Sequence, residues 1–208
     1  MRSRRSFETM LLLGAMVVGL GMAAPAPAQE FTIDPAHSYV GFGVKHMMVA
    51  TVRGSFAGVE GTITLDLKNP EKSSVVATVD AATIDTNNND RDAHLKSADF
   101  FDVAKHPKIT FTSTSVSKTG EDWVAQGVLD MHGVKREVAV NFRLLGPVKD
   151  PWGNTRLGVD VDPLKIDRQD FGLTWNKVLD GGGVVVGNTV TVTLSVEAVQ
   201  KKDEAAKE

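Results

Sequence analysis

Cysteine is absent from the 208-residue chain. Disulfides therefore cannot stabilise the fold, and a thiol cannot serve as a nucleophile or as a metal ligand. No lipobox cysteine is present to carry a lipid anchor. The serine-nucleophile motif G-x-S-x-G is missing as well, so the sequence contains no motif of covalent catalysis. These absences favour a protein that is not an enzyme.

An excess of basic residues is also absent, since the formal net charge is −3. Removal of residues 1–28 takes away three arginines and Glu8. The remaining chain has 20 basic and 25 acidic residues and a formal net charge of −5. Nucleic-acid phosphates and anionic membrane surfaces both require a basic face. We therefore expect no nucleic-acid partner, no polybasic membrane-docking surface and no stable membrane insertion.

Long apolar runs are scarce, and the main one is at residues 10–24, broken only by glycines. It is shorter than the roughly 20 residues that span a bilayer as a helix. Three arginines precede it, and the small-x-small site Ala26-Pro27-Ala28 follows it. Residues 1–28 are thus predicted to be a cleavable signal peptide, with a retained anchor as the alternative.

The export route stays open. Ser3-Arg4-Arg5-Ser6-Phe7 resembles the twin-arginine signal S-R-R-x-F, although Glu8 replaces the hydrophobic residue expected next. Adjacent arginines are also common in Sec signals. By either route we expect a periplasmic protein.

Alternation of apolar and polar residues with a period of two dominates the mature chain. It is typical of antiparallel strands with one buried face. The apolar positions fall in 40–44, 59–65, 75–79, 109–111, 124–129, 138–142 and 190–196. Turn residues at 68–71, 118–122 and 132–135, and longer loops at 147–153 and 180–183, separate the runs. This predicts a single all-β domain over residues 29–200, a barrel or sandwich of about eight strands, followed by a charged, flexible tail at 201–208.

Two segments interrupt the strand pattern and are expected to contain short helices. Residues 45–50 can form a helical turn. In 90–105, Asp90 can N-cap one helix and Ser97 a second turn. We also expect Asp92 to pair with His94, and Asp34 with His37.

Metal-binding motifs are not evident. Residues 85–90 begin like a calcium loop, but Asp90 and Lys96 stand where glycine and a bidentate glutamate are required. The histidines lack metal-site spacing, so we expect no metal. Each histidine is instead expected to hydrogen-bond the backbone of a loop or to lie at a rim of the barrel. The alternative is that barrel closure gathers several of them. They are His37, His46, His94, His106 and His132.

Methionine and aromatic side chains concentrate in the strands and helical segments. In a barrel of about eight strands they either fill the core or line a space for one slender ligand. The candidate tunnel residues are Phe42, Val44, Met47, Met48, Phe56, Leu95, Phe100, Phe101, Phe111, Met131, Phe171, Leu173 and Trp175. Candidates for a ligand headgroup at the rim are His46, His94 and Arg168. Arg168 lies between Asp167 and Asp170, so a structural ion pair is the alternative role for it.

Several motifs, in order, resemble the YceI-like family of polyisoprenoid-binding, lipocalin-like proteins. The most specific is Asp92-Ala93-His94-Leu95-Lys96-Ser97-Ala98-Asp99-Phe100-Phe101-Asp102, close to the family's D-x-H-L-x-S-x-D-F-F-D. The weaker ones include 34–46, Val52-Arg53-Gly54-Ser55-Phe56, 106–111 and 168–175. Asp130-Met131-His132 departs from the uncharged, threonine-rich strand end more common in the family.

The resemblance covers nearly all of residues 31–199 and implies an extended antiparallel eight-stranded barrel with an apolar tunnel. It implies non-enzymatic carriage of a long-chain lipid, such as an isoprenoid quinone or a polyprenyl phosphate, with no cofactor besides that ligand. Two alternatives remain: a quinone-linked electron-transfer accessory using rim histidines, and a stress-response barrel with a filled core and no lipid. Whether the barrel forms a homodimer stays open.

Overall fold

The computed structural model describes residues 28–202. Residues 1–27 of the predicted signal peptide and residues 203–208 of the predicted tail lie outside this range. The strands are β1 (Gln29–Ile33), β2 (Tyr39–His46), β3 (Ala50–Phe56), β4 (Glu60–Leu65), β5 (Ser74–Asp80), β6 (Lys108–Thr119), β7 (Asp122–Met131), β8 (Val134–Lys149), β9 (Thr155–Asp167) and β10 (Val186–Gln200). The helices are α1 (Asn89–Lys96) and the 3-10 turns η1 (Pro70–Lys72), η2 (Ala81–Thr83) and η3 (Arg168–Phe171).

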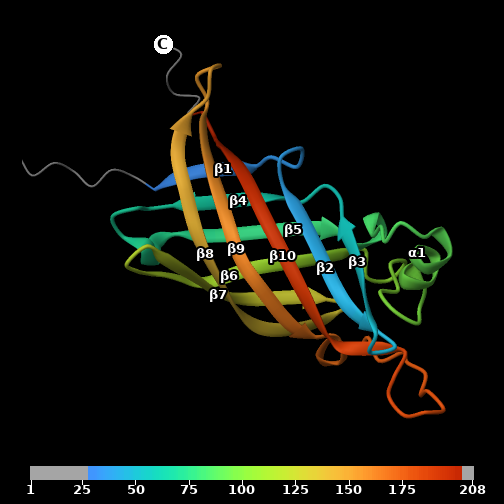
Figure 1. Cartoon of the computed structure of the whole chain (residues 1–208). Helices are drawn as coiled ribbons and strands as arrows, with labels where there is room; N and C mark the ends of the chain where they lie inside the picture. Colours follow the sequence, from blue (N-terminus) through green and yellow to red (C-terminus); the bar gives the residue numbers. More distant parts are fainter. Residues whose placement is uncertain (1–27, 203–208) are drawn as a thin grey trace, which may run out of the picture.

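Eight antiparallel strands close into a barrel, as predicted. The ring runs β1-β4-β5-β6-β7-β8-β9-β10, and β10 pairs back with β1. The same edge of β10 is divided between two strands: its last residues, Ala198–Gln200, pair with β1, whereas Val186–Ser195 pair with β2. The β2–β3 hairpin thus extends the sheet at the end of the barrel that carries α1 (Figure 1).

The two ends of the barrel differ in packing. Trp123, Phe31 and Leu157 are at most 2% exposed and form one cluster with Ala198, beside the β1–β10 closure. Met131, at the other end of β7, packs with Phe100 in a second cluster near α1. Since a strand advances about 3.3 Å per residue, these clusters lie about 25 Å apart along β7. The end away from α1 is therefore filled by side chains.

Residues 155–167 form β9, although no strand was predicted there. Asp162 and Pro163 occupy a bulge opposite Thr193, because Val161 pairs with Leu194 and Leu164 with Val192. A bulge shifts the inward face by one residue. The inward series 157, 159, 161 consequently continues at 164 and 166, and the simple alternation is lost.

Two of the three local predictions about the helical segments were wrong, and the one about Ser97 is confirmed. Residues 45–50 contain no helical turn: Lys45 and His46 end β2, Ala50 begins β3, and the three residues between them form the β2–β3 turn. The N-cap of α1 is Asn88, not Asp90, because the Asn88 side chain accepts a hydrogen bond from the backbone N–H of Arg91. Ser97 caps the turn that carries Phe100 and Phe101, since its side-chain oxygen accepts from the N–H of Asp99 and its carbonyl from the N–H of Phe100. It is also the C-cap of α1, where its hydroxyl donates to the carbonyl of His94.

Two further loop predictions can be compared with the structure. The predicted loop at 147–153 is shorter than expected, since β8 continues to Lys149. The predicted His132-Gly133 turn is confirmed: it joins β7 to β8, and both residues have positive φ.

Candidate functional site

An apolar cavity of about 210 Å³ occupies the middle of the barrel. None of its lining residues is charged, and Thr78 is the one that carries a hydroxyl group. That hydroxyl lies 3.1 Å from the hydroxyl of Thr110, with which it is hydrogen-bonded. The wall comes from β1, β2, β3, β4, β5, β6, β7, β8, β9 and β10 and from the residue before β4: Ile33, Val40, Phe56, Val59, Ile63, Val75, Ala77, Thr78, Val79, Ile109, Phe111, Ala125, Leu129, Met131, Val138, Val140, Phe142, Val159, Val161, Leu164, Ile166, Val192, Leu194 and Val196. We call it the barrel cavity.

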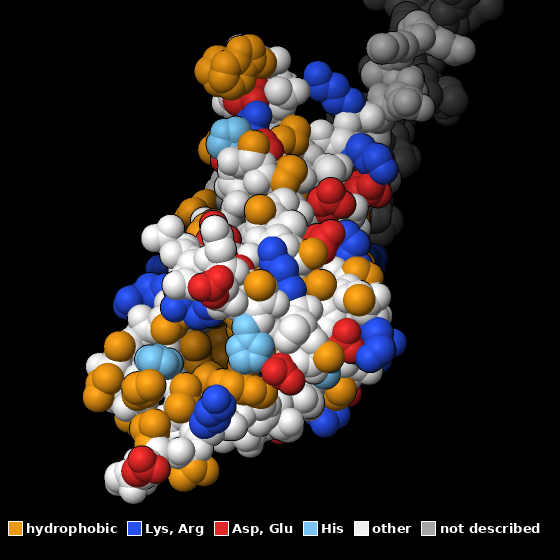
Figure 2. Space-filling view, turned by 90° about the vertical axis from the view of Figure 1, so that its right-hand side faces the viewer, with side chains coloured by type: hydrophobic (Ala, Val, Ile, Leu, Met, Phe, Trp, Pro, Cys, Tyr) orange, Lys and Arg blue, Asp and Glu red, His pale blue; other side chains and the backbone are white. Residues whose placement is uncertain are grey.

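A second cavity, of about 200 Å³, lies between the β2–β3 hairpin, α1 and the segment from η3 to β10. We call it the mouth cavity. Its lining residues are Phe42, Val44, Lys45, His46, Val52, Arg91, His94, Leu95, Phe100, Trp175, Val185 and Val186. Figure 2 faces this end and shows a hollow with hydrophobic side chains in its floor and histidine side chains at its edge.

Aromatic rings separate the two cavities. Phe42 lines the mouth cavity and Phe56 the barrel cavity, and their ring centroids are 5.7 Å apart. Phe101 contacts Phe56 edge-on at the same centroid distance. Gly54 leaves room for the Phe42 ring, since a Cβ at Gly54 would lie 2.5 Å from Phe42 Cζ. These rings therefore lie between the mouth cavity and the barrel cavity.

The lining of the mouth cavity includes Lys45, His46, Arg91 and His94, and it includes no carboxylate. Trp175 and Phe100 fix the ring of His94, which meets both edge-on at centroid distances of 4.9 and 5.0 Å. Nε2 of His94 lies 2.9 Å from a carboxylate oxygen of Asp99, an acidic residue outside the cavity lining. The cavity is thus apolar in its floor and basic at its edge.

Arg91 is held in place by Thr86. Its Nε donates to the Thr86 hydroxyl at 2.7 Å, and its Nη2 donates to the Thr86 carbonyl at 2.8 Å. The buried carboxylate of Asp92 accepts from the backbone N–H and the hydroxyl of Thr86. The predicted Asp92–His94 pair is therefore wrong, because Asp92 bonds Thr86 and His94 bonds Asp99.

The candidate tunnel residues are distributed over both cavities. Phe56, Phe111 and Met131 line the barrel cavity. The mouth cavity takes Phe42, Val44, Leu95, Phe100 and Trp175, together with the candidate rim residues His46 and His94. The remaining candidates line neither cavity: Phe101, Phe171 and Leu173 pack in the cluster around Phe100, and Met47 and Met48 are exposed at the β2–β3 turn.

Arg168 lines neither cavity and is only 4% exposed. Its guanidinium donates to the backbone carbonyls of Leu173 and Gly187, and to that of Val186 at 3.4 Å. Burial lowers the pKa of this guanidinium from its ordinary value, and the negative charge of Asp167 opposes that shift. Arg168 thus ties η3 to β10 through carbonyl groups, rather than through the ion pair given as its alternative role.

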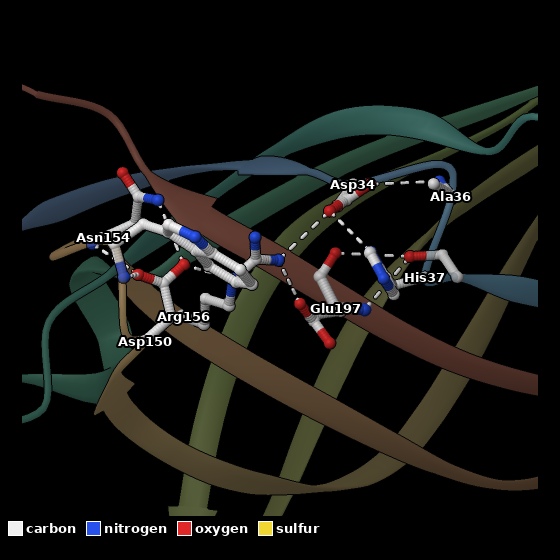
Figure 3. A network of polar contacts seen from close by, with 9 residues as sticks. Asp34, Ala36, His37, Asp150, Asn154, Arg156 and Glu197 are labelled. Carbon is white, nitrogen blue, oxygen red and sulfur yellow. Dashed lines mark hydrogen bonds and ion pairs between the residues drawn. The ribbon is translucent and has the colours of Figure 1, made fainter.

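The other histidines contact neighbouring loops. The predicted His37–Asp34 pair is present, at 2.9 Å. Nδ1 of His132 lies 3.0 Å from the carbonyl oxygen of Phe171, and the His132 and His106 ring centroids are 4.8 Å apart. In the described part of the chain, the one group with metal-site spacing is Asp34, His37 and Glu197. The guanidinium of Arg156 already bonds both of these carboxylates (Figure 3).

Sequence reasoning missed two parts of the site. The first is the aliphatic wall supplied by β8, β9 and β10, because the valines of alternating strands do not by themselves distinguish a cavity wall from a filled core. The second is Arg91. Arg91 precedes His94 and Leu95 on α1 by three and four residues, a spacing that places all three side chains on one face of a helix. This spacing could have indicated from the sequence that Arg91 belongs to the site.

Comparisons with known proteins agree with this architecture. Residues 31–198 match the model of the YceI-like domain family. Protein YceI of Escherichia coli is 39% identical over 194 residues, 92% of this chain and 98% of that protein. Two solved structures share the fold. Burkholderia cenocepacia BcnA has a TM-score of 0.69 at 21% identity over 79% of this chain and 98% of its own. A polyisoprenoid binding domain from Saccharophagus degradans, implicated in plant cell wall breakdown, has a TM-score of 0.61 at 18% identity over 82% and 98%.

Proposed function

Since the chain belongs to the YceI-like family, we propose that it binds a long apolar lipid of the polyisoprenoid kind inside the barrel, without catalysing a reaction. The observation that carries the proposal is the wall of the barrel cavity, which holds no charged side chain. Burying an isoprenoid tail there would remove apolar surface from water, at roughly 25 cal/mol per Å². A barrel of the same fold, the Saccharophagus degradans domain, is described as polyisoprenoid binding.

The absence of catalysis is part of the proposal. General acid–base and nucleophilic catalysis both need titratable or nucleophilic groups beside the reacting atoms. The wall of the barrel cavity offers the Thr78 hydroxyl alone, and that hydroxyl is bonded to Thr110. Such a wall supports binding by shape and apolar contact.

The headgroup is assigned to the mouth cavity. Lys45, Arg91, His46 and His94 surround it, and basic side chains with N–H donors suit an anionic oxygen-rich group. A polyprenyl phosphate therefore fits this mouth better than an uncharged quinone ring. The tail would pass the Phe42–Phe56 rings to reach the barrel cavity.

Carriage across the periplasm completes the proposal. It is supported by the signal-peptide pattern in residues 1–28, of which 1–27 lie outside the described residues. In the described part of the chain, none of the helices has the length and apolar character needed to cross a membrane. A filled-core barrel, the alternative considered above, fits the structure less well because the barrel contains a cavity.

Native mass spectrometry of freshly purified protein tests the proposal, followed by mass spectra of its organic extract. We expect a bound species with the mass of an isoprenoid lipid. Val140→Phe narrows the barrel cavity and should reduce the bound fraction about tenfold or more, because a filled volume excludes the tail. Ala139→Phe introduces the same residue at an exposed position one residue earlier on β8 and should keep the lipid. Repeated extracts that contain no lipid above background would refute the proposal.

A further inference from the structure

The β2–β3 turn presents apolar side chains to solvent beside the mouth cavity. Met47, Met48 and Val49 are 42%, 61% and 84% exposed. Val178, in the loop that precedes β10, is 81% exposed. We call Met47, Met48, Val49 and Val178 the apolar tip. The loop that carries Val178 projects beyond the barrel (Figure 1).

The backbone of this turn is strained. The N–H of Val49 donates to the carbonyl of His46 at 3.1 Å, and the two residues between them have φ of 49° and 62°. Positive φ at both central positions is the pattern of a type I′ turn, for which Asn-Gly is the favoured sequence. Methionine at both positions gives up backbone stability and also exposes apolar surface. Neither property stabilises the fold, and both suit a contact with something outside it.

The two parts of the apolar tip form one surface that adjoins the mouth cavity. The N–H of Met47 donates to the carbonyl of Val185 at 2.8 Å, and Met48 Cγ lies 3.9 Å from where a Cβ on Gly183 would be. His46 and Val185, which flank this contact, line the mouth cavity. A surface that contacts the tip therefore also faces the mouth.

We propose that the apolar tip docks reversibly into the surface of a lipid bilayer and so places the mouth cavity against the membrane. Aliphatic side chains on a turn reach the boundary between headgroups and acyl chains, and affinity grows with the apolar area buried there. Lys45 and Lys177, both exposed, flank the tip and favour anionic lipid, although Asp180 lies on the same loop. The contact depends on apolar side chains, which suits a protein without a polybasic surface.

Docking of the apolar tip on a membrane is separate from the binding of a lipid inside the barrel. Only the idea that docking serves the uptake of that lipid rests on the proposed function. Flotation with vesicles of phosphatidylethanolamine and phosphatidylglycerol measures docking, whereas lipid in organic extracts measures the proposed function. The two can fail separately. We expect wild-type protein to float with these vesicles, and to float less with vesicles of phosphatidylcholine alone.

The decisive variant is Met47→Asn combined with Met48→Gly. It installs the residues that a type I′ turn favours, so the thermal midpoint should rise or stay unchanged, while the floating fraction should fall about tenfold. Misfolding then cannot explain the loss. Trp152→Ser is the matched control, because Trp152 is 78% exposed in the β8–β9 connection, away from the mouth, and its removal should leave flotation unchanged.

Three outcomes would overturn the proposal. One is a double variant that floats as well as wild type. Another is loss of flotation in Trp152→Ser instead, which would move the contact to the other end. The third is a concentration-dependent dimer, measured by sedimentation, that the double variant abolishes while flotation is unchanged, since the tip would then bind a second copy.

Discussion

Thr86 connects the stability of the α1 region to the geometry of the mouth. It is 6% exposed, and its hydroxyl both donates to Asp92 and accepts from Nε of Arg91. A buried carboxylate and a guanidinium therefore share one hydroxyl group, and each also bonds the Thr86 backbone. In this way a residue outside the cavity lining positions a residue that lines it.

Thr86→Val removes that hydroxyl at nearly constant volume. We expect the free energy of unfolding to fall by about 1–3 kcal/mol, because Asp92 and Arg91 each lose a buried partner. The bound fraction in native mass spectra should also fall, since Arg91 keeps only its hydrogen bond to the Thr86 carbonyl and is held less firmly. Urea unfolding and native mass spectrometry measure the two effects. Thr112→Val, the same change at an exposed position on β6, should alter neither, and equal effects in both variants would contradict the role given to Thr86.

At the scale of the elements, β4 and β5 approach so closely that only glycine fits at Gly61. Gly61 pairs with Ala77, and a Cβ on Gly61 would lie 2.0 Å from the carbonyl oxygen of Val76. A glycine inside a strand commonly marks such an approach of two backbones. Ala77 and the inward face of β5 line the barrel cavity, so this approach also sets the shape of the cavity.

We predict that Gly61→Ala destabilises the barrel by about 3 kcal/mol, because the strands must separate to admit a methyl group. Gly58→Ala is the natural comparison. Gly58 has φ of 67° but nothing within 4 Å of its added Cβ, so only the backbone cost of about 1 kcal/mol applies. Chemical unfolding of both variants gives the difference; a Gly61→Ala barrel no less stable than Gly58→Ala would show that the sheet relaxes freely there.

The alternating strands, the eight-stranded ring and the short helical insertion could be predicted from the sequence. What could not be predicted depends on contacts between distant segments. The bulge at Asp162-Pro163 hides the alternation of β9 and is set by pairing with β10. The β2–β3 turn lacks the glycine or asparagine that marks positive φ, so Met47 and Met48 were expected to be helical. In the site, the apolar character was predictable, but the lining by β8–β10 depends on barrel closure.

At the scale of the whole molecule, one arginine spans the line where the barrel closes (Figure 3). Arg156, on β9, bonds Asp150 in the β8–β9 connection, Asp34 after β1 and Glu197 on β10. Its guanidinium lowers the pKa of Asp150 well below the usual range. Asp34 also has a lowered pKa, mainly through its hydrogen bond with His37 and further through Arg156.

Because of this network, the free energy of unfolding should decrease as the pH falls. A carboxyl whose pKa is lowered by folding stabilises the folded state above its ordinary pKa, and that contribution is lost as the pH falls towards the folded pKa. We expect the urea midpoint to fall continuously from about pH 5 downwards. Arg156→Gln should lower the midpoint at pH 7 and flatten this acid dependence. Arg143→Gln, which breaks an exposed ion pair with Asp160, should leave the profile nearly unchanged; parallel profiles for wild type and Arg156→Gln would contradict the argument.

The cluster of buried side chains around Trp123, which fills one end of the barrel, has a consequence for any chain-like ligand. A barrel that is closed at one end admits such a molecule only from the other end. The leading end of the molecule must then stop at the indole of Trp123. The distance from Trp123 to the mouth then sets the length of chain that fits inside the barrel. A molecule of that length is fully enclosed, and a longer one leaves its remaining part outside. Length selection would therefore be built into the architecture, without any group that recognises the far end of the chain.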